Sequence, residues 1–265
     1  MNWHRRIEVL TPLFNRGAYQ DSPEIRVPSV RGMVRWWFRW LGGKPHEEKQ
    51  LFGGMKGFGG PACPDVMASR LVFRIRSDQL AYPSAKLPTL PHKSGGRASP
   101  QAAFRPGIQF DLHVQDRFEP LPAELLARAE SALEVWLLLG ALGLRANRSG
   151  GNVWPADDTA PKTPAALRSR LDQLGCRWPV MLVGERVGSN IEELRAAATD
   201  TVNGPDWVFG CARGRNRVAS ALKFKVVRFE MGLRLLAFAP DHRVLEEARK
   251  CLHGHRSNPE TWNLI

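Results

Sequence analysis

The chain has 265 residues, 43% of them hydrophobic and 24% charged, which is typical of a soluble globular protein and excludes wholesale disorder. Lys and Arg number 38 against 26 Asp and Glu, a net charge of +12, and 29 of the cations are Arg. Because Arg grips phosphate through two parallel hydrogen bonds and stacks on flat rings, this composition predicts a polyanionic partner, above all a nucleic acid.

Other classes of protein are excluded by simple patterns. The longest apolar stretch, 132–144, is too short to span a bilayer, and the N-terminal residues lack the apolar run of a secretory signal. The four cysteines lie far apart, so we expect reduced thiols in the cytoplasm. Cys251, His253 and His255 lack an evident fourth metal ligand, and segment 53–60 matches no nucleotide-binding pattern, so neither a metal nor a cofactor is predicted.

The first half of the chain predicts strands interleaved with helices. A strand is expected over 3–10, and a helix over 30–41 with Ser29 as its N-cap. Segment 69–77 alternates apolar and cationic residues, which predicts a strand with one apolar and one cationic face. Segment 78–106 contains five prolines and shows no periodicity, so it is predicted to be a long, mobile loop.

The second half repeats this alternation. A strand over 108–114 and a helix over 120–140 lead into the basic, glycine-rich loop 143–151, and 155–164 has the composition of a linker. The elements expected beyond the linker are a helix over 165–174, a strand over 179–183, a helix over 191–198, strands over 219–229 and 232–239, and a helix over 241–252. Two adjoining strands in each half indicate α+β units of the βαββαβ type.

A weak internal repeat supports a duplicated module. Leu51-Phe52-Gly53-Gly54 precedes Ala68-Ser69 and an alternating strand, and Val208-Phe209-Gly210-Cys211 precedes Ala219-Ser220 and another such strand. A Phe-Gly turn, a loop and an Ala-Ser pair therefore recur in the same order in both halves.

The predicted helix over 30–41 carries the most specific chemistry. Arg31, Arg35 and Arg39 recur every four residues and share one side, with Trp36 beside them. Such a cationic row can neutralise phosphates while the indole stacks on a base, worth about 1–3 kcal/mol per base. The alternative is a solvated Arg face with its Trp residues in the core, although no acidic residue of this helix balances the three Arg.

Two basic loops could add contacts. In loop 143–151, glycines permit close backbone approach, so successive N–H groups could form an anion cradle. Segment 213–217 could bind an anion in the same way. The alternative for loop 143–151 is a turn that only ends the preceding helix, and the alternative for segment 213–217 is a solvated loop. Because the RNA-recognition fingerprint of an aromatic sheet is absent, we expect RNA contacts from loops and helices.

Residues 11–39 resemble a known family. The stretches Thr11-Pro12-Leu13-Phe14 and Ser29-Val30-Arg31-Gly32-Met33-Val34-Arg35-Trp36-Trp37 are similar to the N-terminal signature of the Cmr-one family, the first-named subunits of type III-B CRISPR effector complexes within the RAMP superfamily. Leu51-Phe52-Gly53 and loop 143–151 are also RAMP-like.

This resemblance implies two packed ferredoxin-like domains, 1–155 with a mobile insertion near 78–106, and 156–265. It implies a non-catalytic subunit that binds RNA near the 3′ end of the guide RNA, beside other RAMP subunits, and helps to capture target RNA. Guide RNA, target RNA and RAMP subunits are therefore the expected partners, and no membrane is.

The predicted RNA contacts lie just before and on the helix over 30–41, in the glycine-rich segments and in the basic segment of the second half. They are Arg26, Ser29, Arg31, Arg35, Trp36, Arg39, Phe52, Lys56, Arg145, Asn147, Arg148, Arg213, Arg215 and Arg217. Trp36 or Phe52 is expected to stack on a base, and no catalytic residue is predicted.

Two other functions stay open. One is a metal-independent RAMP endoribonuclease that matures guide RNA through His4 or His113, although no second catalytic group is evident in the sequence. The other is a scaffold whose Arg surface binds protein partners.

Overall fold

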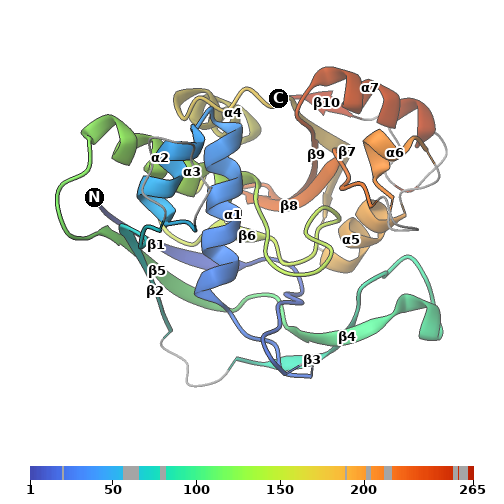
Figure 1. Cartoon of the computed structure of the whole chain (residues 1–265). Helices are drawn as coiled ribbons and strands as arrows, with labels where there is room; N and C mark the ends of the chain where they lie inside the picture. The colour runs from blue at the N-terminus through green and yellow to red at the C-terminus, as the bar shows by residue number, and fades with distance from the viewer. Residues whose placement is uncertain are drawn as a thin grey trace.

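The computed structural model describes residues 1–19, 21–55, 66–77, 82–188, 190–200, 204–211, 217–252, 256 and 262–265. Within these ranges the chain forms two four-stranded sheets and one two-stranded sheet, with helices packed against them (Figure 1).

The first four-stranded sheet and its helices come from the N-terminal half. The elements are β1 (Asn2–Val9), α1 (Val27–Trp40), α2 (Pro45–Phe52), β2 (Leu71–Arg76), β5 (Gln109–Asp116), α3 (Ala123–Leu139) and β6 (Val153–Pro155). The strands lie in the order β2-β5-β1-β6, and every neighbouring pair is antiparallel. Strand side chains alternate between the two faces, so Trp3, Ile7 and Leu112 point into the core that α1 and α3 cover.

The second four-stranded sheet repeats this plan. After α4 (Pro164–Gln173), its elements are β7 (Val180–Gly188), α5 (Ile191–Thr199), α6 (Asp206–Phe209), β8 (Lys223–Phe229), β9 (Gly232–Phe238), α7 (His242–Cys251) and β10 (Asn263–Leu264). The strand order is β10-β7-β9-β8, again antiparallel. Counted within each unit, both sheets have the order fourth, first, third, second. This is the ferredoxin-like βαββαβ arrangement, so the predicted α+β fold with two such units is confirmed.

One apolar core cluster extends across both units, and a second cluster lies within the second unit. Trp37 of α1 packs on Trp178, whose ring also contacts Phe238 of β9, with ring centroids 4.9 and 6.1 Å apart. The sheet of the first unit ends with β6 at Pro155, but the packing continues across that point. The division into domains 1–155 and 156–265 stays a prediction.

The Phe-Gly repeat is confirmed as a structural repeat. Gly53 and Gly210 have φ values of 76° and 77°, and each ends a short helix. The hydroxyl of Ser69 donates to the carbonyls of Leu51 and Leu71, and the hydroxyl of Ser220 donates to the equivalent carbonyls of Val208 and Leu222. Both turns therefore use the same glycine conformation and the same serine bridge.

Helix α1 begins earlier than predicted. It starts at Val27, with Pro28 in its first turn, where a missing N–H costs no helical hydrogen bond. The N-cap position is Arg26, and no side chain caps the helix. Ser29 lies inside the first turn, and its hydroxyl donates to Asn15 Oδ1 at 3.2 Å, so its expected capping role was wrong.

The predicted loop over 78–106 was wrong for most of its length. Its described part contains β3 (Ser84–Pro88), the short helix η1 (Gly95–Ala98) and β4 (Pro100–Phe104), with β3 and β4 paired antiparallel. Pro88 and Pro100 form the last pair of this ladder, where strands tolerate proline, so the prolines did not prevent pairing. Residues 78–81 lie outside the described residues.

Loop 143–151 of the first unit covers an edge of the second. Strand β8 is the edge strand of its sheet. The N–H of Phe224 donates to the Asn147 carbonyl at 3.1 Å, and the N–H of Ser149 donates to the Phe224 carbonyl at 3.3 Å. An uncovered edge strand exposes unpaired N–H and C=O groups, so this loop both joins the units and satisfies the edge.

Candidate nucleic-acid interface

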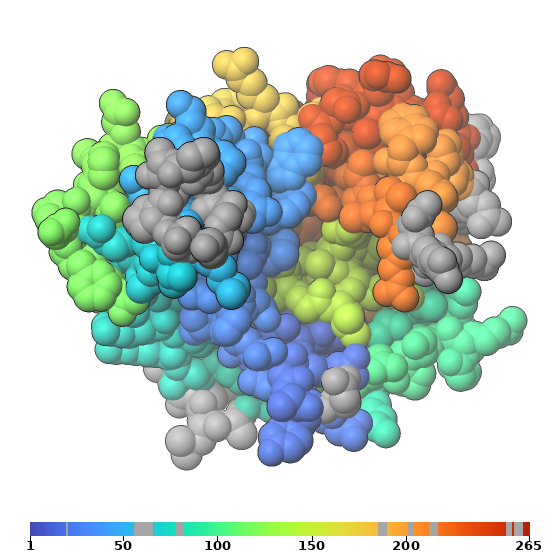
Figure 2. Space-filling view, viewed as in Figure 1, coloured from blue at the N-terminus to red at the C-terminus, as the bar shows by residue number. Residues whose placement is uncertain are grey.

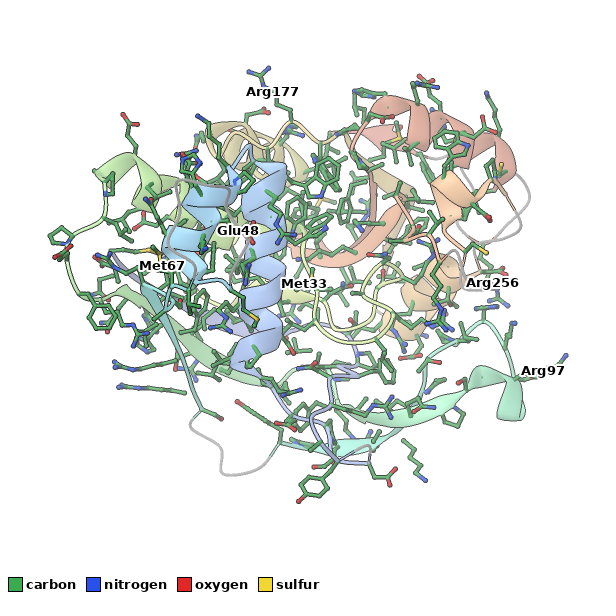
Figure 3. All side chains as sticks on the ribbon, viewed as in Figure 1. Met33, Glu48, Met67, Arg97, Arg177 and Arg256 are labelled. Atoms are coloured by element: carbon green, nitrogen blue, oxygen red, sulfur yellow. The ribbon has the colours of Figure 1, made fainter. Side chains whose placement is uncertain are left out.

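The arginine row of α1 meets an acidic partner from α2. Glu48 accepts a hydrogen bond from Arg35 Nε at 2.8 Å and two from Arg39, from Nε at 2.6 Å and from Nη2 at 2.7 Å. The Glu48 side chain is only 2% exposed, whereas that of Arg39 is 51% exposed. Figure 3 shows Glu48 between the two helices. Burial raises the pKa of Glu48, but the hydrogen bonds from Arg39 and Arg35 outweigh it and leave that pKa below its ordinary value.

This pairing changes the expected charge of the row. Two guanidinium groups share this carboxylate, which offsets part of the positive charge of Arg35 and Arg39. Arg31, one turn earlier, faces no carboxylate of the described residues within ion-pairing distance. Sequence reasoning examined acidic residues only within the helix and therefore missed Glu48. The signal that could have found it is the Glu47-Glu48 pair shortly after the helix.

Trp36 lies in a cluster of indoles where the two units meet. Its ring centroid is 4.9 Å from that of Trp37, 5.7 Å from Trp40 and 5.6 Å from Trp178. The ammonium of Lys223, from β8, lies 5.0 Å from the Trp36 ring centroid. Trp36 is therefore partly enclosed, whereas Trp40 is 46% exposed and presents the larger indole surface to solvent.

Phe52 does not fit its predicted role of stacking on a base. It is 2% exposed and packs against Phe38 and Phe73, with ring centroids 5.8 and 6.4 Å away. The physical reason is its place at the end of α2, one residue before Gly53, where the turn directs the ring into the core. That prediction was wrong.

Five of the N–H groups of loop 143–151 have backbone partners in the protein. Those of Leu144 and Gly151 donate to carbonyls of the segment that follows β1, and those of Arg148 and Gly150 donate to the Arg145 carbonyl. Backbone donors that bind carbonyls cannot also cradle an anion, so the predicted cradle was wrong for these groups. Arg145 itself is exposed and has a φ of 61°, in the left-handed region that ordinary residues rarely adopt.

Arg148 joins the two units at their contact, which we call the seam. Its guanidinium donates to the carbonyls of Leu222 at 2.8 Å and Phe209 at 3.2 Å and lies over the Phe224 ring. Burial, followed by the charge of Arg145, lowers its pKa to about 10. Backbone carbonyls occupy the donors that a phosphate would need, so the predicted RNA contact was wrong for Arg148.

Asn147 and Lys223 form a second polar pair at this seam. Asn147 Oδ1 accepts a hydrogen bond from Lys223 Nζ at 2.8 Å. Burial, followed by the charge of Arg148, lowers the pKa of Lys223 to about 8. Lys223 was not among the predicted contacts; its place in an alternating strand gave no sign that it would face Trp36.

The remaining predicted contacts divide into two groups. Arg26 is half-buried and donates to the Arg16 carbonyl at 3.3 Å, and Arg217 is exposed. Lys56, Arg213 and Arg215 lie outside the described residues, as do His253 and His255.

Cationic and aromatic groups of both units thus meet on one face. Figure 2 shows loop 143–151 in a hollow between α1 and the segment around residue 210. Trp36, Lys223 and Asn147 are linked by direct contacts, and Arg145 stands exposed on the same loop as Asn147. We define this set, together with Arg31 and Trp40, as the seam surface. It suits a chain of phosphates and flat bases.

Comparison with known proteins identifies the class. A sequence profile of the RAMP superfamily matches residues 6–154, more than half of the chain, so this protein belongs to the RAMP superfamily. The resemblance to the Cmr-one family is also confirmed. The chain is 57% identical over 37 residues to the CRISPR system Cmr subunit Cmr1-2 of Pyrococcus furiosus, a match that covers 14% of this chain and 20% of that protein's length.

Solved structures show the same fold. The crystal structure of Cmr1 from Pyrococcus furiosus aligns with a TM-score of 0.60 and 18% identity, covering 90% of this chain and 87% of that one. A chain of the type III-B Cmr-beta complex bound to cognate target RNA aligns with a TM-score of 0.55 and 11% identity, covering 94% and 99%. In the described part of this chain, the helices are too short or too polar to cross a bilayer.

Proposed function

We propose that this chain is an RNA-binding, non-catalytic subunit of a type III-B CRISPR effector ribonucleoprotein in the cytoplasm. It lies near the 3′ end of the guide RNA, beside other RAMP subunits, and helps to capture target RNA. The observation that carries the proposal is the seam surface, where Trp36 of the first unit contacts Lys223 of the second, with Arg31 on the same helix as Trp36 and exposed Arg145 on the loop between the units. The RAMP family and the fold shared with a chain of a target-RNA-bound complex support it.

Binding at the seam surface has two physical parts. Arg31, Arg145 and Lys223 neutralise phosphates and release counterions, which gives affinity without sequence readout. The exposed ring of Trp40 offers a platform on which a base can stack, worth about 1–3 kcal/mol. Trp36 positions Lys223 from beneath through the cation–π contact.

The test is the salt dependence of RNA affinity, measured by fluorescence anisotropy with a labelled single-stranded RNA. If Arg31, Arg145 and Lys223 each neutralise one phosphate, log K falls against log salt with a slope of about −2. Arg31→Ala and Arg145→Ala should each weaken binding and flatten the slope by about 0.7. Arg97→Ala is the matched control, because Arg97 is exposed in η1 and points away from the seam surface (Figure 3).

Two results would contradict this proposal. One is an affinity that does not respond to salt. The other is that Arg97→Ala and Arg31→Ala weaken RNA binding equally, which would show that affinity depends on total charge and not on the seam surface. Charge reversal at Arg31 that blocks assembly with partner subunits but leaves RNA binding intact would favour the scaffold instead.

The ribonuclease alternative is kept because the structure pairs its two residues. His4 and His113 lie opposite each other on β1 and β5, with ring centroids 4.2 Å apart and planes inclined by 21°. Stacked rings leave no room for a phosphodiester between an acid and a base, so binding fits this geometry better than cleavage. Incubation with repeat RNA in EDTA decides: specific cleavage that His4→Ala or His113→Ala abolishes would establish the enzyme.

A further inference from the structure

The first sheet has an outer face that α1 and α3 do not cover. Along β1, β2 and β5 the buried side chains alternate with outward ones. The outward set includes His4 and Arg6 of β1, Arg74 and Arg76 of β2, and Asp111 and His113 of β5, and Glu8 of β1, which Arg228 binds, lies in the next row. This is the side of the sheet opposite the helices that carry the seam surface.

Register places these side chains in rows across three strands. His4 pairs with His113, which pairs in turn with Arg74. In the next row Arg6 pairs with Asp111, which pairs with Arg76. Adjacent strands lie about 4.8 Å apart, so each row spans about 10 Å. His4 Nε2 lies 3.2 Å from Asp111 Oδ1, which links the two rows.

The face is cationic even with its histidines neutral. Arg74 donates to Gln115 Oε1 at 3.3 Å and Arg6 to Gln109 Oε1 at 3.1 Å, so each of these contacts is with a neutral amide. Asp111 is the one carboxylate within the two rows. Within the two rows the three Arg therefore outnumber the carboxylates, and the carboxylate of Asp111 contacts His4.

We propose that this outer face, which we call the His–Arg face, is a second RNA contact of the protein, where Arg74, Arg76 and the stacked His4–His113 pair hold phosphate of a single-stranded RNA. It is separate from the seam surface and does not depend on it. The protonated pair offers ring N–H donors, and flat imidazole and guanidinium groups also suit the stacking of a base.

Charge and chemistry favour a phosphate chain over other ligands. A metal cation would be repelled by the three Arg. An apolar partner would have to desolvate exposed charges, and this desolvation penalty exceeds the free energy gained by burying apolar surface. A phosphate instead gains charge-assisted hydrogen bonds from the guanidinium groups and from any protonated imidazole.

Binding at the His–Arg face should strengthen as the pH falls. The pKa of His113 is lowered by burial first, then by the charge of His4 and of Arg76 and Arg74, whereas Asp111 opposes this shift. These groups, with Arg6 beside them, are the charges that face the pair, and α1 and α3 pack on the other side of the sheet. A bound phosphate neutralises the neighbouring cations and so raises the pKa of His113, which couples binding to proton uptake.

The test uses the full chain and two probes. Inorganic phosphate is titrated while the imidazole signals of His4 and His113 are followed by NMR, and labelled single-stranded oligouridine is titrated by anisotropy at about pH 8 and about pH 6. We expect RNA affinity to rise about fivefold between these conditions in the wild type. The double variant His4→Gln/His113→Gln should abolish this rise in affinity. The double variant Arg74→Gln/Arg76→Gln should weaken RNA binding at both pH values.

Matched controls come from α7. His242, Arg243 and Arg249 are exposed there, on the second unit. His242→Gln, and Arg243→Gln with Arg249→Gln, should leave both the pH dependence and the affinity within twofold of wild type. All variants are compared after their thermal unfolding has been shown to be cooperative.

The outcomes separate this proposal from that for the seam surface. If the paired His variants keep the full pH dependence, or phosphate moves neither imidazole, the His–Arg face is refuted while the seam surface can still bind. If those variants leave RNA affinity unchanged but block assembly, the face belongs to a protein partner. RNA cleavage in EDTA that the His variants abolish would assign catalysis instead of binding.

Discussion

Glu48 of α2 accepts two hydrogen bonds from the guanidinium of Arg39 on α1, at 2.6 and 2.7 Å. The same carboxylate accepts a third from Arg35. A residue in a short second helix thus sets how much of the α1 charge is available to a ligand, and it joins the two helices beside the seam surface.

Glu48→Gln should destabilise the protein. It removes the carboxylate charge that Arg35 and Arg39 share, at a cost of about 2–3 kcal/mol, below that of a fully buried pair because Arg39 is half-exposed. The lowered pKa of Glu48 means that its stabilisation is present above its unfolded pKa of about 4.3 and is lost as the pH falls through the lower folded value. Urea unfolding at several pH values should show that the free energies of unfolding of the wild type and Glu48→Gln converge in acid. A difference that stays constant with pH would refute this prediction.

Lys223 should make stability rise with pH above neutrality. Its folded pKa of about 8 lies below the unfolded value of about 10.4, so the unfolded chain binds more protons between these values. The free energy of unfolding should therefore increase with pH over this window in the wild type and flatten in Lys223→Met. Exposed Lys93 provides the control, and Lys93→Met should retain the wild-type slope.

The two Phe-Gly turns should be intolerant of a methyl group. A Cβ at Gly53 would lie 2.7 Å from Met67 O, and one at Gly210 would lie 2.7 Å from Ser220 N. Gly175 has a similar φ of 75° with open space around it, so Gly175→Ala reports the left-handed strain alone, about 1–2 kcal/mol. Gly53→Ala and Gly210→Ala should each lose at least about 1 kcal/mol more in chemical denaturation. Equal losses of unfolding free energy at Gly53, Gly210 and Gly175 would contradict the close backbone contacts that the two turns share.

Arg195 should hold the β3–β4 hairpin on the second unit. Its side chain is fully buried and donates to the Pro88 carbonyl at 2.9 Å. Arg195→Met keeps most of the apolar stem but removes this charged hydrogen bond, worth about 1.5 kcal/mol. Amide hydrogen exchange in β3 and β4 should accelerate about tenfold. Arg249→Met, at an exposed position of α7, should leave it unchanged.

Where sequence reasoning failed, the missing information was a contact between distant segments. Phe52 and Arg148 look like available ligand contacts in the sequence, but one ring turns into the core and one guanidinium binds carbonyls of the other unit. The hairpin over 84–104 was missed because its strands are short and begin or end at prolines. His4 and His113 are more than a hundred residues apart, and only strand register brings them together.

The amino-acid sequence by itself determined the order of most strands and helices, the recurrence of the Phe-Gly turn, the excess of Arg and the resemblance to the Cmr-one family. These properties are local, because burial of one face of a helix or strand gives a regular spacing of apolar residues along the chain. Only the tertiary structure decided which cations stay available to a ligand. That depends on partners such as Glu48, on the carbonyls around Arg148 and on the seam between two sheets, none of which leaves a periodic trace in the chain.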